Sequence, residues 1–279
     1  MQEIIPLTLA HSPDSDDAFM FWALASRRVI PDGIDFRHVL ADIQTLNNAA
    51  IEGLYDVSAI SVHAYPYVAA NYILLNMGAS VGDGYGPRVV ARENISQSEL
   101  NGRVVGIPGG LTTAALVLKL AFPGVRTTEM SFDHVTDAVS NGEVDAGVLI
   151  HEGQITFEQM GLHLVTDLGK WWKDTTGLPL PLGANVVRKS LGEDIIEKAA
   201  SAIRDSIQAG LENREAALRY AAGFGRELKA EEVDKFVGMY VNDYTLDWGE
   251  TGREAVRELL GRAKASGIVD STGEINFTG

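Results

Sequence analysis

The chain has 279 residues, of which 46% are hydrophobic, so it can bury the core of one large domain or of two lobes. Its 38 acidic side chains outnumber the 23 basic ones, and the formal net charge of −15 argues against nucleic acid or an anionic membrane as a partner. The absence of cysteine excludes disulfides, thiolate metal sites and cysteine nucleophiles.

Short β-like runs alternate with amphipathic helical stretches. We expect strands at residues 5–10, 57–62, 72–75, 88–91, 103–107 and 146–150. We expect helices at 16–26, after an N-cap at Asp42, at 112–122, and in three or more segments from 192 to about 266. This alternation predicts an α/β protein with a mainly parallel sheet.

The N-terminal segment has neither the basic stretch nor the apolar stretch of a secretory signal, and no apolar run approaches the roughly 20 residues of a membrane span. Together with the absence of cysteine, this pattern leads us to expect a cytoplasmic location.

One short pattern occurs twice. The segment Gly53–Ile60 is echoed by Gly142–Leu149: a helix ends at Gly, two residues follow, and Asp opens a strand of small and apolar residues. Glycine suits the left-handed end of a helix, and aspartate suits the turn into a strand. The repeat predicts equivalent positions in two lobes.

Two extended stretches, residues 89–94 and 183–188, are the expected crossovers between the lobes. They divide the chain into a discontinuous large lobe, 1–92 with 187–279, and a small lobe, 93–186. Two crossovers form a hinge, and a hinge creates a cleft that can close on a ligand.

A glycine-rich turn precedes the helix expected at 112–122. Gly109 and Gly110 are followed by Thr112, Thr113 and Ala114. Free amides and the positive end of a helix attract a carboxylate or phosphate, and threonine hydroxyls add donors. A tight turn with Thr112 as an ordinary helix cap would give the same pattern, so both interpretations stay open.

His151 directly follows the apolar run at 146–150. The carboxyl ends of parallel strands are where α/β proteins place their sites, and an imidazole can exchange a proton near neutral pH. A histidine hydrogen-bonded at a strand end is the structural alternative.

Ser61 lies at the end of the equivalent run, and Asn47 lies on the preceding helix. Ser61 lacks the G-x-S-x-G elbow of a hydrolase and an acid placed to orient a base, so we expect it to hydrogen-bond a ligand rather than to attack it. The start of a capped helix after His63 is the structural alternative.

The acidic run from His11 to Asp17 lacks the spacing of a calcium loop, and helix capping explains it best. Either His11 or Asp14 could still line the cleft. The other histidines give no ligand-spaced pair, so no metal is expected. The aromatic residues at 171–172 and 240–248 are expected to pack in the core.

The motifs in this order resemble one family. They are His11–Phe21, Asp42–Asn47, Ser58–Tyr65, Gly78–Pro87, Thr112–Ala114, Leu149–Gln154, Leu178–Gly183 and Tyr240–Tyr244. The set is similar to the 1,4-dihydroxy-6-naphthoate synthases of the futalosine route to menaquinone, over nearly the whole chain.

The resemblance implies a type II periplasmic-binding-protein fold with two lobes and a hinge of two crossover strands. It also implies a lyase that converts cyclic dehypoxanthine futalosine to 1,4-dihydroxy-6-naphthoate without metal or organic cofactor. His151 matches the family's proton acceptor. Substrate contacts are implied for Asn47, Ala59, Ile60, Ser61, Thr112, Thr113 and Ala114.

Three other classes remain as alternatives. A solute-binding protein for a small carboxylate would share the fold, but it would normally carry an export signal. Chorismate dehydratase, a sibling enzyme, shares the fold without the His-Glu-Gly string. A transcription-factor effector domain would need a DNA-binding helix-turn-helix. The expected partner is a small carboxylate substrate, and a homodimer stays possible.

Overall fold

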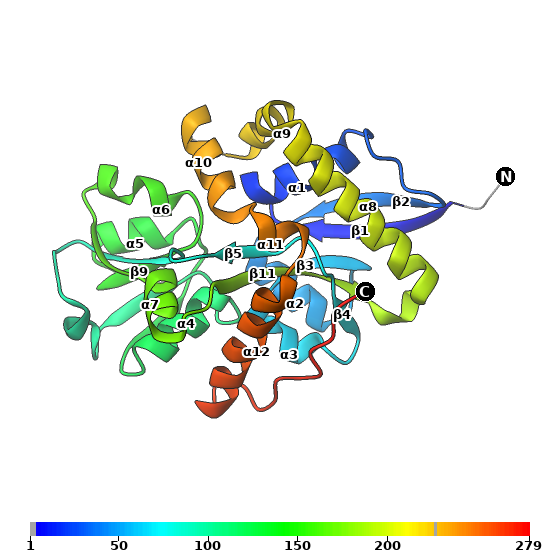
Figure 1. Cartoon of the computed structure of the whole chain (residues 1–279). Coiled ribbons are helices and arrows are strands. Elements are labelled where there is room, and N and C mark those ends of the chain that lie inside the picture. Colours follow the sequence, from blue (N-terminus) through cyan, green and yellow to red (C-terminus); the bar gives the residue numbers. More distant parts are fainter. Residues whose placement is uncertain (1–3, 226–227) are drawn as a thin grey trace.

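Two β-sheets organise the chain. The computed structural model describes residues 4–225 and 228–279, and Figure 1 shows one lobe around each sheet. The first sheet contains β2 (Ile34–Leu40), β1 (Ile5–His11), β3 (Val57–Ser61), β11 (Leu180–Arg188) and β4 (Tyr72–Leu74) in this order, with β5 (Ser80–Gly82) paired to β11. The second contains β10 (His163–Asp167), β6 (Arg88–Ala91), β9 (Ala146–Leu149), β7 (Val104–Ile107) and β8 (Arg126–Glu129).

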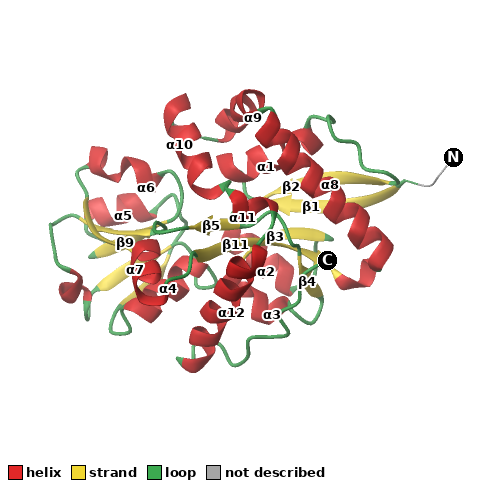
Figure 2. Cartoon of the chain, viewed as in Figure 1, coloured by secondary structure: helices red, strands yellow, loops and turns green. Residues whose placement is uncertain are grey.

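Helices lie on both sides of each sheet, as Figure 2 shows. The first lobe contains α1 (Ser15–Ala25), α2 (Ile43–Ile51), α3 (Tyr65–Val68), α8 (Glu193–Glu212), α9 (Arg214–Ala221), α10 (Ala230–Tyr240), α11 (Asp243–Leu246) and α12 (Gly249–Ala265). The second contains α4 (Thr113–Ala121), α5 (Val135–Asn141), α6 (Gly153–Thr156) and α7 (Leu168–Thr176). Short 3-10 helices are η1 (Val62–Ala64), η2 (Gln97–Leu100), η3 (Phe157–Met160), η4 (Lys189–Leu191) and η5 (Ala222–Phe224). Among the described residues, no helix has the length and apolar character needed to cross a membrane.

The repeated sequence pattern marks equivalent positions of the two sheets. In the first sheet β2, β1 and β3 are parallel and β11 is antiparallel to β3; in the second β8, β7 and β9 are parallel and β6 is antiparallel to β9. Asp56 accepts a hydrogen bond from the N–H of Thr8 at 2.8 Å, and Asp145 accepts one from the N–H of Val104 at 2.8 Å. Each aspartate therefore ties the start of one strand to its parallel neighbour, as the repeat predicted.

The strand pattern differs from the expectation in two ways. Four strands at 34–40, 80–82, 126–129 and 163–167 were not anticipated, because they are short or half-exposed and carry many polar residues. The two stretches expected as crossovers lie within the sheets: β6 pairs within the second sheet, and β11 begins at Leu180 and pairs within the first. The division at residues 92 and 187 stays a prediction.

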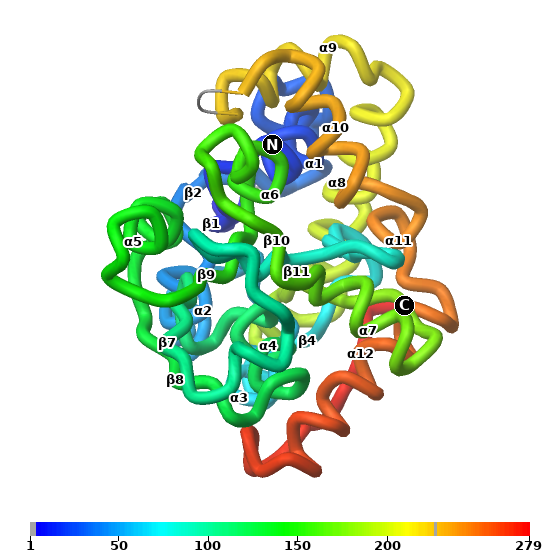
Figure 3. Tube along the Cα trace, turned by 90° about the vertical axis from the view of Figure 1, so that its left-hand side faces the viewer, coloured from blue at the N-terminus to red at the C-terminus, as the bar shows by residue number. Residues whose placement is uncertain are grey.

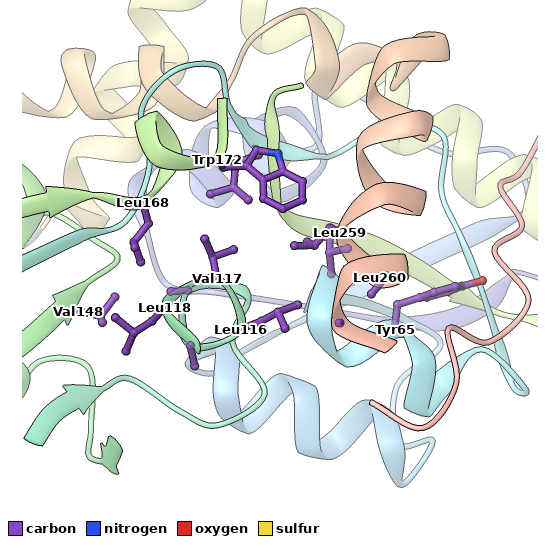
Figure 4. Close-up of a cluster of buried hydrophobic side chains, with 14 of the residues drawn as sticks. Tyr65, Leu116, Val117, Leu118, Val148, Leu168, Trp172, Leu259 and Leu260 are labelled. Atoms are coloured by element: carbon purple, nitrogen blue, oxygen red, sulfur yellow. The ribbon is translucent and has the colours of Figure 1, made fainter. Parts of the chain in front are cut away.

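The lobes share more than the crossover strands. One buried cluster contains Val148 and Leu118 of the second lobe together with Leu259 and Leu260 of α12 in the first (Figure 4). Figures 1 and 3 show α12 running past α4 and α7. Trp172 is fully buried in the same cluster, which confirms its expected role in packing. Apolar packing therefore closes one side of the molecule between the lobes.

Candidate active site

A cavity opens between the lobes, and most residues singled out by the sequence lie around it. Ala59, Ile60, Ser61, Thr112, Thr113, Ala114 and His151 all line this cavity. They come from β3 in the first lobe and from the α4 start and the β9 end in the second. Asn47 is fully buried behind the wall rather than on it.

Asn47 fixes the orientation of Ser61. Its Oδ1 accepts a hydrogen bond from the Ser61 N–H at 2.8 Å, and its Nδ2 donates to Ser61 Oγ at 3.1 Å. Because Ser61 Oγ accepts this bond, its own O–H can donate to a ligand. This arrangement suits hydrogen bonding to substrate. The direct contact implied for Asn47 stays a prediction, since the geometry gives it an indirect role.

The two threonines at the α4 start use their hydroxyls within the protein. Thr112 Oγ1 accepts from the Ala115 N–H at 3.2 Å and donates to the Gly109 carbonyl at 2.8 Å, as an ordinary N-cap does. Thr113 Oγ1 donates to the Leu182 carbonyl at 2.7 Å and accepts from the His63 N–H at 3.2 Å. Neither hydroxyl is therefore free to hold a ligand in this conformation.

The backbone at the same helix start remains available. Among the hydrogen bonds of residues 4–225 and 228–279, none uses the N–H of Thr113 or of Ala114 as donor. Both residues line the cavity. Two N–H groups and the positive end of α4 thus supply donors for a carboxylate.

One ring nitrogen of His151 contacts a carboxylate of the protein, and the other is available to a ligand. Its Nδ1 lies 3.2 Å from Oδ2 of Asp14, which comes from the first lobe just before α1. Its Nε2 is buried and, within the described part of the chain, has no hydrogen-bond partner. The ring of Phe132 meets the imidazole edge-on, with centroids 4.6 Å apart. The ring is thus fixed between Asp14 and Phe132.

The acidic run before α1 does more than cap the helix. Asp14 occupies the N-cap position but makes no capping hydrogen bond with its side chain. Instead it lines the cavity beside Asp16 and Asp17. Burial and the nearby Asp14 carboxylate raise the pKa of Asp16 to about 6. Burial also raises the pKa of Asp17, whose Oδ2 accepts from the Ser12 N–H at 2.7 Å. Asp14 therefore does not cap the helix with its side chain, and its placement agrees with the alternative left open, that Asp14 lines the cleft.

His11, the other histidine left open, lies away from the cavity. Its Nδ1 is 3.1 Å from the Ser12 carbonyl, and its Nε2 is 3.0 Å from Nδ1 of His38. Burial lowers the pKa of His11 to about 3. With both ring nitrogens engaged, His11 cannot serve as a base for a bound ligand.

Several groups near the cavity were missed by the sequence reasoning. Phe236 was not singled out and Tyr240 was expected only to pack, yet both line the cavity, and Tyr240 donates from its hydroxyl to Gln154 Oε1 at 2.9 Å across the lobes. Asn185 also lines it, and Ser80 donates to Asp16 Oδ2 at 3.3 Å. The motifs that carry the family resemblance include Tyr240 and Ser80, and this was the one available signal.

Asp14, His151 and Glu152 each place one ligand-type atom within 4.8 Å of the others. No sequence pattern indicates this trio, because Asp14 is far from the other two residues along the chain. Acidic groups and a histidine at such distances can also attract a cation, so the expectation of no metal stays a prediction.

Comparison with known proteins identifies the family of the chain. Residues 7–265 match the family model described as menaquinone biosynthesis. The chain is 39% identical over 273 residues to 1,4-dihydroxy-6-naphthoate synthase of Streptomyces coelicolor, covering 96% of both chains. It is 40% identical over 262 residues to the enzyme of the same name from Thermus thermophilus, covering 94% of this chain and 95% of that one.

Solved structures extend the comparison to the fold. A crystal structure of a protein from Archaeoglobus fulgidus is 45% identical, with a TM-score of 0.91 over 95% of this chain and 98% of that one. The alkanesulfonate-binding protein of Xanthomonas axonopodis shares the fold at 11% identity, with a TM-score of 0.73 over 98% and 97% of the two chains. The chain therefore belongs to the menaquinone-biosynthesis family and is a biosynthetic enzyme with the two-lobed fold of periplasmic binding proteins.

Proposed function

We propose that the protein is a lyase that converts cyclic dehypoxanthine futalosine to 1,4-dihydroxy-6-naphthoate, with His151 as the proton acceptor. The observation that carries this proposal is the Nε2 of His151, which is buried at the cavity and makes no hydrogen bond among the described residues. The shared name of the two curated relatives supports the reaction, and it favours this enzyme over its sibling chorismate dehydratase.

The charge distribution of the cavity orients the substrate. None of the described residues that line it is lysine or arginine, so a carboxylate has to be held by N–H and O–H donors. These donors are the backbone N–H groups of Thr113 and Ala114 and the hydroxyl of Ser61. The carboxylate of Asp14 lines the same cavity and repels a second carboxylate, whereas the raised pKa values of Asp16 and Asp17 favour their neutral forms. The substrate carboxylate therefore points to the start of α4.

The chemistry requires removal of a proton before a carbon–carbon or carbon–oxygen bond next to a ketone can break. A neutral imidazole can accept this proton at Nε2, and burial excludes the water that would compete for it. No nucleophile is needed, which agrees with the engagement of Ser61 by Asn47.

The test is to incubate the purified protein with cyclic dehypoxanthine futalosine and to follow 1,4-dihydroxy-6-naphthoate by absorbance and mass spectrometry. We expect turnover by the wild type and a kcat lowered at least about 100-fold in His151→Gln, a variant that keeps side-chain size and polarity. Tight binding of the product without any turnover of the substrate would contradict the proposal and favour a solute-binding function.

A further inference from the structure

The carboxylate of Asp14 is positioned to decide which nitrogen of His151 carries the proton. Nδ1 of the imidazole lies 3.2 Å from Asp14 Oδ2, whereas Nε2 has no partner in the described part of the chain. A carboxylate accepts hydrogen bonds and cannot donate one when ionised. It therefore favours the tautomer with hydrogen on Nδ1, which leaves the lone pair of Nε2 free for the substrate.

Asp14 is itself held in place. Its side chain is 3% exposed, and its Oδ2 accepts a hydrogen bond from Ser12 Oγ. The backbone N–H of Ser12 is in turn bound by Asp17 at 2.7 Å, so the loop before α1 is tied at two points. A carboxylate fixed in this way orients the ring and stabilises the imidazolium that forms when the base takes a proton.

The two partners belong to different lobes. Asp14 precedes α1 in the first lobe, and His151 follows β9 in the second. On the basis of the proposed function, we infer that Asp14 is a positioning residue for His151 and that this pair forms across the cleft only while the lobes are together. The base then acquires its reactive tautomer when the cavity is closed around a ligand.

Other acidic side chains near His151 allow the effect of the Asp14 contact to be distinguished from the effect of any nearby negative charge. Glu152 is adjacent to it in sequence, and a carboxylate oxygen of Glu152 lies within 4.8 Å of the His151–Asp14 pair. Asp16 accepts a hydrogen bond from Ser80, with 3.3 Å between the oxygens. If any nearby negative charge sufficed, Glu152→Gln would act like Asp14→Asn. If the contact between Asp14 and Nδ1 is what counts, the two variants differ.

The first arm of the test is kinetic and compares Asp14→Ala, Asp14→Asn and Glu152→Gln. We expect Asp14→Ala to lower kcat at least about 100-fold, the size of effect that positioned proton transfer supplies. Its KM and its affinity for 1,4-dihydroxy-6-naphthoate should change by less than about threefold, because the start of α4 and Ser61 are untouched. The fold-decrease in kcat caused by Glu152→Gln should be less than one tenth of that caused by Asp14→Ala. Equal losses in both variants, or an unchanged kcat in Asp14→Ala, would overturn the inference.

The second arm does not depend on turnover. Nitrogen-15 NMR of histidine-labelled protein reports which ring nitrogen carries hydrogen. With saturating 1,4-dihydroxy-6-naphthoate, His151 of the wild type should be protonated at Nδ1, whereas Asp14→Ala should shift toward protonation at Nε2. Ligand-free wild type should show a smaller Nδ1–H fraction than the bound form.

These results separate the two hypotheses. The inference fails if the tautomer is the same in wild type and Asp14→Ala, or if ligand has no effect on it. The proposed function fails instead if wild type shows the expected tautomer but makes no naphthoate. Asp14→Asn keeps the size of the side chain, and product binding by this variant shows that its fold is intact.

Discussion

The hydroxyl of Thr113 joins the two lobes, and its removal should weaken the folded structure. Thr113 is 2% exposed on α4 of the second lobe. It donates to the carbonyl of Leu182 at 2.7 Å and accepts from the N–H of His63 at 3.2 Å, both in the first lobe. Thr113→Val keeps the shape of the side chain but leaves these buried groups without this partner.

The structure sets the size of the effect. Leaving a buried donor or acceptor unsatisfied costs about 1–3 kcal/mol. For a chain of this length each kcal/mol lowers Tm by about 2–4 °C, so Thr113→Val should melt roughly 2–12 °C below the wild type without ligand. Thr113→Ser is the matched control, because it keeps the hydroxyl and loses only a methyl group, and its Tm should lie closer to that of the wild type.

The Tm of the wild type, Thr113→Val and Thr113→Ser is measured by calorimetry or by fluorescence during heating, and the product affinity of each protein is measured in parallel. A Thr113→Val protein as stable as the wild type, but with product affinity reduced tenfold or more, would refute this reasoning. That result would mean that the hydroxyl holds the ligand carboxylate, as the sequence suggested, and that its bonds to Leu182 and His63 are incidental.

Three further predictions concern the base, the pH dependence and metal. His151→Ala should lower kcat by about 10²- to 10⁴-fold while product affinity, measured by calorimetric titration, stays near wild type; a near-normal kcat would assign the base elsewhere. Burial lowers the pKa of His63 to about 4, so below about pH 6.5 the unfolded chain binds a proton at His63 that the folded protein does not. As the pH falls from about 6.5 toward 4, the free energy of unfolding should therefore decrease by up to about 1.4 kcal/mol per pH unit. Urea unfolding at pH 7, 6 and 5 should show a shallower fall for His63→Gln, and parallel curves would contradict this. Elemental analysis of protein purified without metal-affinity steps should find no stoichiometric metal; bound zinc with activity lost to a chelator would instead point to Asp14, His151 and Glu152.

The sequence by itself determined the local structure and much of the architecture. Asp42 accepts from the N–H groups of Gln44 and Thr45 as an N-cap, and Gly142 ends its helix at a φ of 77°, because these signals act within a few residues. The repeat around Asp56 and Asp145 revealed the two lobes, because equivalent units need the same turn into the same strand. The order of motifs also predicted the family.

The sequence also predicted where most of the candidate site lies, because α/β proteins place their sites at the carboxyl ends of parallel strands. Ser61 and His151 follow apolar runs, and the carboxyl ends of parallel strands converge on a cleft in this kind of fold. Only the identity of the residues and their position along a strand were needed for that prediction.

Only the tertiary structure decided how these side chains are used. The contact of Asp14 with His151 joins segments that no local pattern links, and it depends on how the lobes meet. Thr113 looked like a ligand donor until the fold brought Leu182 and His63 to its hydroxyl. Local sequence specifies caps, turns and periodicity, whereas hydrogen-bond partners across a cleft are chosen by the packing of whole lobes, which no short segment encodes.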